Sequence, residues 1–298
     1  MKMIAFTLLI AFGSTMMPAV SNAQDEKTLS ELVARDWGAG TIVSERRRNA
    51  GSPSVLLNKN GDAVAVWIEE GIGNFKTNIY SSQLKSGAHI WTPSIAIGEG
   101  IVDIQNISSP SVQANYSYDF AVDDNGSFAV TWSENNRVYL AKTDLNGAWS
   151  KPSLITDTAN QVGQPRLELV NGKGIVGWYE RSASRMDVKV AVVNIATSTI
   201  SEERTLSTKS LLTSYDRYQD YSYIELQLLR NNDILAVWPD ADSNLYYARY
   251  SSTEGWGTSS SIEKTNARVF KIVPSDDDAA KVIYIGADDF AQNSLLVR

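Results

Sequence analysis

Five charged side chains of this 298-residue chain lie in corresponding segments of its repeats, and their types could support acid–base chemistry or ligand binding. Three carboxyl groups could supply a general acid and a nucleophile or base, as glycoside hydrolysis requires. Two cations beside them would pair with these carboxylates, and a neighbouring cation lowers a carboxyl pKa. The five residues are Asp119, Arg166, Glu168, Glu225 and Lys271.

The spacing of these residues predicts that they share one face of extended strands. Side chains alternate between the two faces of a strand, and an apolar residue follows the aligned position in each repeat, which is Ser54 in the first repeat and a charged residue in the other four. These apolar residues are Val55, Phe120, Leu167, Leu226 and Ile272. Two interpretations of the charged face stay open. It lines a water-filled channel in which the charges pair, or it forms a ligand site, because convergent polar groups in a concave mouth bind small polar ligands.

Tyrosines near the two longest connections favour the ligand site. Residues 99–115 and 208–219 are insertions that precede the charged strands, so we expect both to lie over the same mouth. A tyrosine offers a flat apolar ring and a hydroxyl group, which suits sugar rings and peptide segments. The predicted ligand-binding set therefore adds Tyr116, Tyr118, Tyr218 and Tyr221 to the five charged residues.

Other catalytic and metal chemistry has little support in the sequence. The chain has no cysteine and a single histidine, His89, so a Ser-His-Asp triad or a zinc site would depend on that one residue. Residues 240–244 and 275–278 carry oxygen ligands suited to calcium, but the first segment lacks the glycine and distal glutamate of a full loop. We interpret both as polar turns and expect no metal and no cofactor.

The elements that must position the charged residues are repeated five times. In each copy a turn leads into small apolar residues and an aromatic residue six positions on: Gly61 to Trp67, Gly126 to Trp132, Gly172 to Trp178, Asn232 to Trp238 and Asp278 to Tyr284. Such repeats predict units that bury apolar faces against their neighbours, so we expect the four tryptophans to pack between units.

Each repeat also contains an extended segment before the aromatic strand and two segments after it. The last of these opens with Trp91, Trp149, Ile200 and Trp256 in turn. Four short strands joined by polar turns and repeated radially are typical of a β-propeller blade. The predicted fold is therefore an all-β, five-bladed propeller, because neither insertion is long enough to hold a sixth blade.

The two ends of the chain predict closure of the ring. The fifth repeat ends after its third strand, whereas residues 36–43 resemble residues 148–155, which form a fourth segment. We expect residues 36–43 to complete the fifth blade, since closure removes exposed sheet edges. The predicted blades are 53–98, 116–157, 164–207, 220–263, and 267–298 plus 36–43.

The first 23 residues have the pattern of a signal peptide. Lys2 precedes an apolar stretch from Ile4 to Phe12, and the small residues from Val20 to Ala23 fit a cleavage site. The remaining 24–298 form the single propeller domain, which we expect to be secreted or periplasmic. No later apolar run reaches membrane-spanning length. Cleavage removes one positive charge, so the formal net charge changes from −7 to −8, which disfavours nucleic acid and anionic membranes as partners.

The repeated aromatic pattern resembles secreted bacterial β-propeller proteins of the sialidase-like and lectin-like kind over nearly the whole mature chain. The resemblance implies a fold more than a function, because propellers host many roles. Sialidases grip a substrate carboxylate with three arginines, and here only Arg166 is well placed. The segment from Asp123 to Trp132 approaches an Asp-box turn but lacks its register.

We therefore predict a monomeric, non-catalytic protein that binds a glycan or an extracellular protein at the mouth that carries the insertions. One alternative is a glycoside hydrolase or lyase that uses Asp119, Glu168 and Glu225. Another is a scaffold in an envelope complex that recognises its partners through its rim.

Overall fold

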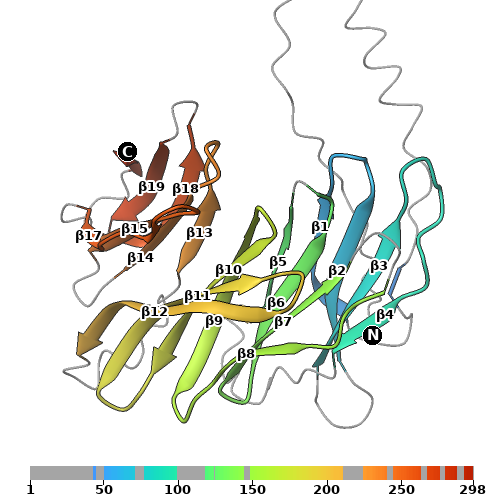
Figure 1. Cartoon of the computed structure of the whole chain (residues 1–298), viewed down its shortest axis with the longest axis horizontal. Coiled ribbons are helices and arrows are strands. Elements are labelled where there is room, and N and C mark those ends of the chain that lie inside the picture. The colour runs from blue at the N-terminus through green and yellow to red at the C-terminus, as the bar shows by residue number, and fades with distance from the viewer. Residues whose placement is uncertain are drawn as a thin grey trace, which may run out of the picture. The chain divides into compact units, whose positions relative to one another are not determined.

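All regular elements that the computed structural model describes are β-strands (Figure 1). The described residues are 43–44, 50–70, 77–98, 118–123, 125–143, 148–210, 224–239, 244–262, 267–275, 279–286 and 292–297. Within them, no helix is long and apolar enough to cross a membrane. The chain divides into residues 1–47 and residues 48–298, and the second unit holds every sheet described below.

The described strands form five antiparallel sheets in chain order. The first contains β1 (Ala50–Leu57), β2 (Ala63–Glu70), β3 (Thr77–Leu84) and β4 (Ile95–Gly98). The second contains β5 (Tyr118–Val122), β6 (Phe128–Glu134), β7 (Arg137–Thr143) and β8 (Ser153–Asp157). The third contains β9 (Gln161–Val170), β10 (Lys173–Arg181), β11 (Arg185–Asn194) and β12 (Thr199–Ser210).

The fourth and fifth sheets complete this part of the chain. The fourth contains β13 (Glu225–Leu228), β14 (Ile234–Pro239), β15 (Leu245–Ser251) and two short strands that both pair with β15, namely β16 (Gly255–Trp256) and β17 (Ser260–Ser261). The fifth has three described strands, β18 (Ala267–Pro274), β19 (Ala280–Gly286) and β20 (Gln292–Val297). Residues 36–42, predicted to supply its fourth strand, lie outside the described residues.

The pairing register confirms the alignment of the repeats. In every sheet the first strand places one column of residues opposite the residue that precedes the repeated aromatic. The pairs are Ser54 with Val66, Asp119 with Thr131, Arg166 with Gly177, Glu225 with Val237, and Lys271 with Ile283. The five positions are therefore structurally equivalent.

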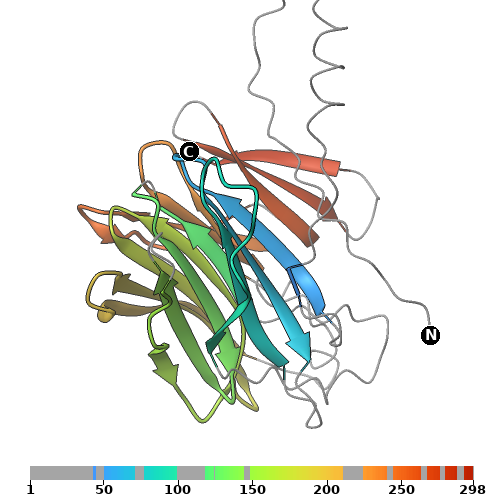
Figure 2. The same ribbon diagram turned by 90° about the vertical axis from the view of Figure 1, so that its right-hand side faces the viewer.

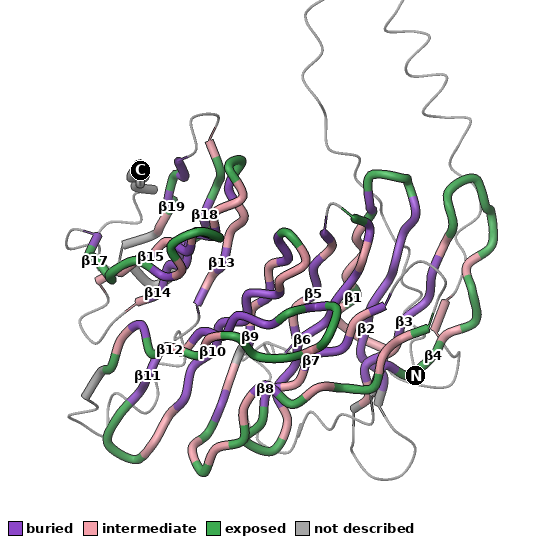
Figure 3. The backbone as a smooth tube through the Cα atoms, viewed as in Figure 1, coloured by how far each residue is buried: buried purple, intermediate pink, exposed green. Residues whose placement is uncertain are grey.

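Successive sheets pack against one another through their first and second strands. The first strands contact one another in chain order, β1 with β5, β5 with β9, β9 with β13 and β13 with β18. Buried residues follow the strands, and exposed residues gather at the turns (Figure 3). The view turned by 90° shows the strands of the first two sheets, blue through green, running alongside one another (Figure 2).

Three of the four repeated tryptophans, those of the second, third and fourth sheets, lie in the apolar layers between sheets, as predicted. Trp132 belongs to the core cluster between the first and second sheets, Trp178 to that between the second and third, and Trp238 to that between the third and fourth. Trp132, Trp178 and Trp238 are almost wholly buried. These indoles fill the space between sheets and present no ring to a ligand.

The outer strands begin later than the sequence predicted in the first two sheets. Trp91 and Trp149 were expected to open them, but β4 begins at Ile95 and β8 at Ser153. Trp149 instead forms an isolated bridge with Thr143, and its indole N–H donates a 2.6 Å hydrogen bond to the hydroxyl of Ser81 in the preceding sheet. Trp149 therefore joins the first and second sheets from the connection that precedes β8.

Candidate functional site

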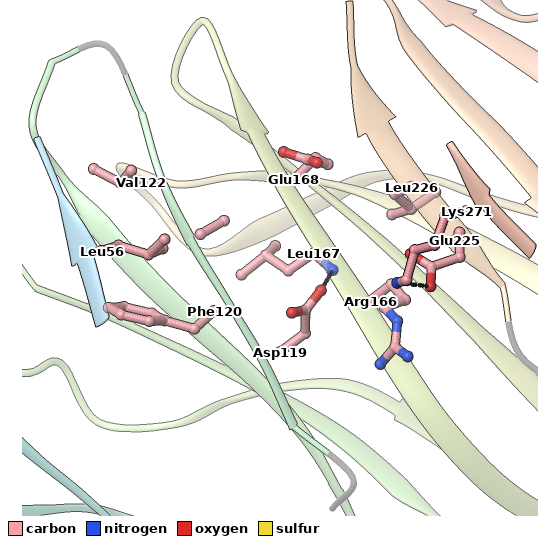
Figure 4. A pocket seen from close by; sticks show the side chains of 11 residues that line it. Leu56, Asp119, Phe120, Val122, Arg166, Leu167, Glu168, Glu225, Leu226 and Lys271 are labelled. Carbon is pink, nitrogen blue, oxygen red and sulfur yellow. Dashed lines mark hydrogen bonds and ion pairs between the residues drawn. The ribbon is translucent and has the colours of Figure 1, made fainter. Parts of the chain in front are cut away.

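A cavity of about 510 Å³ lies against the first strands of all five sheets (Figure 4). Its lining comes from one residue of β1, four of β5, three of β9, two of β13 and one of β18. They are Leu56; Asp119, Phe120, Ala121 and Val122; Arg166, Leu167 and Glu168; Glu225 and Leu226; and Lys271. The five charged residues that the sequence singled out therefore all line this one cavity.

The charged residues lie in two layers. Asp119, Arg166, Glu225 and Lys271 share the equivalent strand position, and we call them the charged layer. Its charges alternate in sign from the second sheet to the fifth. Glu168 lies two residues further along β9, opposite Ile175, at the level of Leu56 and Ala121 in their own strands. Most of the neighbours of Glu168 in this second layer are therefore apolar.

Two members of the charged layer satisfy each other. The ammonium group of Lys271 lies 2.5 Å from a carboxylate oxygen of Glu225, which joins β18 to β13. The lysine side chain is 69% exposed, whereas that of Glu225 is 14% exposed. Because the lysine is largely exposed, this ion pair contributes little to stability. A ligand that binds to either residue must still compete with the other residue of the pair.

Asp119 is held by backbone groups. The N–H of Leu167 donates a 2.9 Å hydrogen bond to its carboxylate, across the gap between β5 and β9. Burial raises the pKa of Asp119, and the nearby charge of Glu225 acts in the same direction. The guanidinium of Arg166 and hydrogen bonds from the backbone of Leu167 and Phe120 oppose this rise without cancelling it.

Glu168 has the more perturbed carboxyl group. Burial, with added repulsion from Asp119 and Glu225, raises the pKa of Glu168 to about 8, against the opposing effect of a hydrogen bond from the backbone of Leu228. At neutral pH this side chain is therefore mostly protonated. A neutral carboxylic acid donates one hydrogen bond and accepts others, so Glu168 offers both functions to a ligand.

Arg166 is the cation of this layer that the protein leaves open. Its guanidinium has no hydrogen-bond or ion-pair partner within the described part of the chain, although its charge acts on Asp119. Figure 4 shows the guanidinium pointing away from the carboxyl group of Glu168. A guanidinium presents several N–H donors in a planar fork and so can take a carboxylate in two parallel hydrogen bonds.

The predicted tyrosines are not part of the cavity lining as far as the structure describes them. Tyr118 is buried, and its hydroxyl donates a hydrogen bond to the carbonyl of Ser52, which joins the second sheet to the first. Burial raises the pKa of Tyr118 well above its ordinary value, with a smaller contribution from Asp119. Tyr116, Tyr218 and Tyr221 lie outside the described residues.

Sequence reasoning missed the apolar part of the lining. Leu56 and Ala121 lie at the position of their first strands that is equivalent to Glu168. The alternation of side chains that assigned Glu168 to the cavity face could therefore have assigned these two residues to it as well. Phe120, Leu167 and Leu226, each next to a member of the charged layer along its strand, also border the cavity. The segments 240–244 and 275–278, interpreted as polar turns, fall largely outside the described residues. Within the described residues, no group of acidic or histidine side chains is arranged to hold a metal.

Comparisons with known proteins indicate a fold and no family. No protein-family model matches the chain, and no curated protein is significantly similar. An acylaminoacyl peptidase structure in complex with Z-Gly-Gly-Phe-chloromethyl ketone has a TM-score of 0.50 at 9% identity. The match covers 84% of this chain but only 38% of the peptidase, so the chain spans well under half of that protein.

Two carbohydrate-related structures also appear among the similar ones. Penicillium chrysogenum alpha-L-arabinanase complexed with arabinobiose has a TM-score of 0.49 at 14% identity, covering 83% of this chain and 77% of the enzyme. Aleuria aurantia lectin in complex with alpha-methyl-L-fucoside has a TM-score of 0.40 at 10% identity, covering 86% and 76%. The structural neighbours are β-propeller proteins, and the resemblance is one of fold alone.

Proposed function

We propose that this chain is a binding protein that takes a glycan in the cavity formed by the first strands of its sheets. The observation that carries the proposal is the convergence of four charged groups and one protonated carboxyl group, from four different sheets, on a single cavity. Its volume of about 510 Å³ falls in the range of small-molecule sites. A polar lining with an apolar border suits a sugar, which has hydroxyl groups and C–H faces.

Each part of the lining has a role in this proposal. Glu168 donates a hydrogen bond to a sugar hydroxyl, and the free guanidinium of Arg166 donates to oxygen atoms of the ligand. Leu56 and Phe120 contact the apolar face of the sugar. Binding does not require a complete set of catalytic groups in a defined geometry. For this reason we propose binding without turnover first.

The proposal includes a closed ring and export of the protein. Residues 36–43 add the fourth strand to the fifth sheet and make it the fifth propeller blade, and residues 1–23 direct secretion or entry to the periplasm. Deletion of residues 24–42 should lower the midpoint of thermal unfolding by several degrees, whereas deletion of residues 24–35 should leave it unchanged. Equal midpoints for the two deletions would contradict closure by this segment.

Binding is tested with the mature chain on a glycan array, followed by calorimetric titration of any sugar retained. The double variant Asp119→Ala plus Glu225→Ala should lose binding while its circular dichroism spectrum stays that of a β-protein. Arg137→Gln is the control, because Arg137 forms an exposed ion pair with Asp157 outside the cavity lining. A wild type that retains no glycan, or a double variant that binds normally, overturns the proposal. Capture of an extracellular protein instead would favour recognition of a protein partner at the mouth.

A second candidate function, a glycoside hydrolase or lyase, is favoured by one observation. Glu168 has its pKa raised to about 8 and so keeps a proton at neutral pH, which is what a general acid requires. Asp119 or Glu225 would then act as base or nucleophile. Turnover of a polysaccharide panel by the wild type, abolished by Glu168→Gln with the fold intact, would support this function over binding alone.

A further inference from the structure

Asp119 and Arg166 carry opposite charges in neighbouring strands of the same layer, yet they form no ion pair with each other. Asp119 is the residue of β5 and Arg166 that of β9 at equivalent positions. The carboxylate of Asp119 is turned to the backbone N–H of Leu167, while the guanidinium of Arg166 has no partner within the described residues (Figure 4). The protein therefore places an acidic and a basic side chain at equivalent positions of neighbouring strands without a direct ion pair between them.

The rest of the lining does not compensate either charge. Lys271 and Glu225 form their own pair at 2.5 Å, so the cation of one is matched by the anion of the other. Glu168, in the next layer, is mostly uncharged at neutral pH. Among the described residues of the lining, Asp119 and Arg166 are consequently the two ionisable groups with which a ligand of matching charge can still pair.

A ligand with a single charge satisfies only half of this arrangement. An anion that binds to Arg166 lies near the carboxylate of Asp119 and is repelled by it, and a cation that binds to Asp119 is repelled by Arg166 in the same way. A ligand that carries both charges gains both attractions. Its carboxylate matches the planar guanidinium fork, and its ammonium group meets a carboxylate oxygen.

We propose that the cavity selects a zwitterionic sugar, with the ligand's carboxylate on Arg166 and its ammonium group on Asp119. This inference rests on the proposed function, since it specifies the charge pattern of the glycan that the cavity takes. Bound in this way, the ammonium group favours the ionised form of Asp119 and so opposes the burial that raises its pKa.

The test compares four sugars of one scaffold that differ in charge, titrated calorimetrically into the mature chain at neutral pH and low salt. Glucose is neutral, glucosamine is a cation, glucuronic acid is an anion, and muramic acid carries both an amine and a carboxylate. We expect muramic acid to bind about tenfold or more tightly than each of the other three, because two charge-assisted contacts form instead of one. Added salt should reduce this preference.

Variants assign each charge of the ligand to its residue. Arg166→Gln should lower the affinity for muramic acid to that for glucosamine, and Asp119→Asn should lower it to that for glucuronic acid. Arg137→Gln, outside the cavity, should leave all four affinities unchanged. Rescue of glucosamine binding in Arg166→Gln would add support, since this variant removes the repulsion that a lone cation meets.

The outcomes separate this inference from the broader proposal. Equal affinity for the four sugars, or tight binding of a neutral glycan with none of muramic acid, overturns the zwitterion assignment and leaves glycan binding intact. An unchanged preference for muramic acid in both cavity variants also overturns the assignment. Absence of binding by these sugars and by every arrayed glycan overturns both.

Discussion

The backbone N–H of Leu167 donates a hydrogen bond to the carboxylate of Asp119 at 2.9 Å, so a side chain of the second sheet holds the main chain of the third. The contact lies beside the cavity, where both residues contribute to the lining. It gives Asp119 a structural role that is separate from any contact with a ligand.

Replacing Asp119 should reveal this role in the free protein. Asp119→Ala leaves the N–H of Leu167 without its acceptor, at a cost of about 1–3 kcal/mol in the free energy of unfolding. Asp119→Asn keeps a carbonyl oxygen and removes a charge that burial disfavours, so it should cost less. Urea unfolding at neutral pH measures both. Equal losses for the two variants would contradict a hydrogen bond between the sheets.

Glu168 should make the stability of the protein depend on pH. Its pKa is about 8 in the folded chain and 4.5 ordinarily, so the folded state holds its proton more tightly than the unfolded state. Stability from this group is fully present below pH 4.5 and is lost as the pH rises to about 8.

The variant Glu168→Gln should remove this dependence, because a glutamine cannot ionise. Above the folded pKa it should be more stable than the wild type, by up to about 5 kcal/mol from the difference between the two pKa values, and near pH 5 the two should be similar. Thermal unfolding across this pH range provides the measurement. Parallel curves for the variant and the wild type would show that Glu168 does not titrate in this way.

Gly177 should be intolerant of any side chain. A Cβ at this position would lie 2.9 Å from the Cδ1 atom of Ile224, which directly precedes β13 of the next sheet. Gly177→Ala should therefore destabilise the fold by about 1–3 kcal/mol through overpacking. Gly163→Ala is a matched control in the same sheet, since a Cβ there would meet nothing within 4 Å.

A second substitution identifies the cause of that loss. Ile224→Val removes the Cδ1 atom, so the double variant with Gly177→Ala should recover part of the stability in a double-mutant cycle. Strictly additive effects of the two substitutions would mean that the two side chains do not collide.

Trp67 should be the repeated tryptophan whose N–H contributes to stability. Its indole N–H donates a 2.7 Å hydrogen bond to Glu69, whereas that of Trp132, at the equivalent position, is buried without a partner among the described residues. Both rings stack on a tyrosine of the next strand. Trp67→Phe should therefore cost about 1–2 kcal/mol more than Trp132→Phe in chemical unfolding. A larger loss for Trp132→Phe would exclude the hydrogen bond as the cause.

The sequence was sufficient to predict the repeats, the strand class and the column of charged residues. The repeated aromatic marks the second strand in each copy, and the period-2 alternation then assigns a face to every residue of the first strand. For this reason Asp119 and Lys271, far apart in the chain, were aligned correctly and do line one cavity.

The partners of these side chains could not be predicted. The alternation of side chains along a strand assigns each residue to a face of the sheet, but it does not give the distances between side chains of different sheets. Nothing in the sequence distinguishes Lys271, which pairs with Glu225, from Arg166, which has no such partner within the described residues. The start of the outer strands was also wrong at Trp91 and Trp149, since an aromatic residue of high strand propensity can equally join two sheets from a connection. Three-dimensional packing decides such cases.

Because every wall of the cavity belongs to a different sheet, ligand preference can be altered one repeat at a time. A charge reversal at Arg166, which has no partner among the described residues, changes the pattern of charges without breaking a contact between sheets, whereas reversals at Asp119, Glu225 or Lys271 would break one. Repeated units of this kind place several substitutable positions around one cavity.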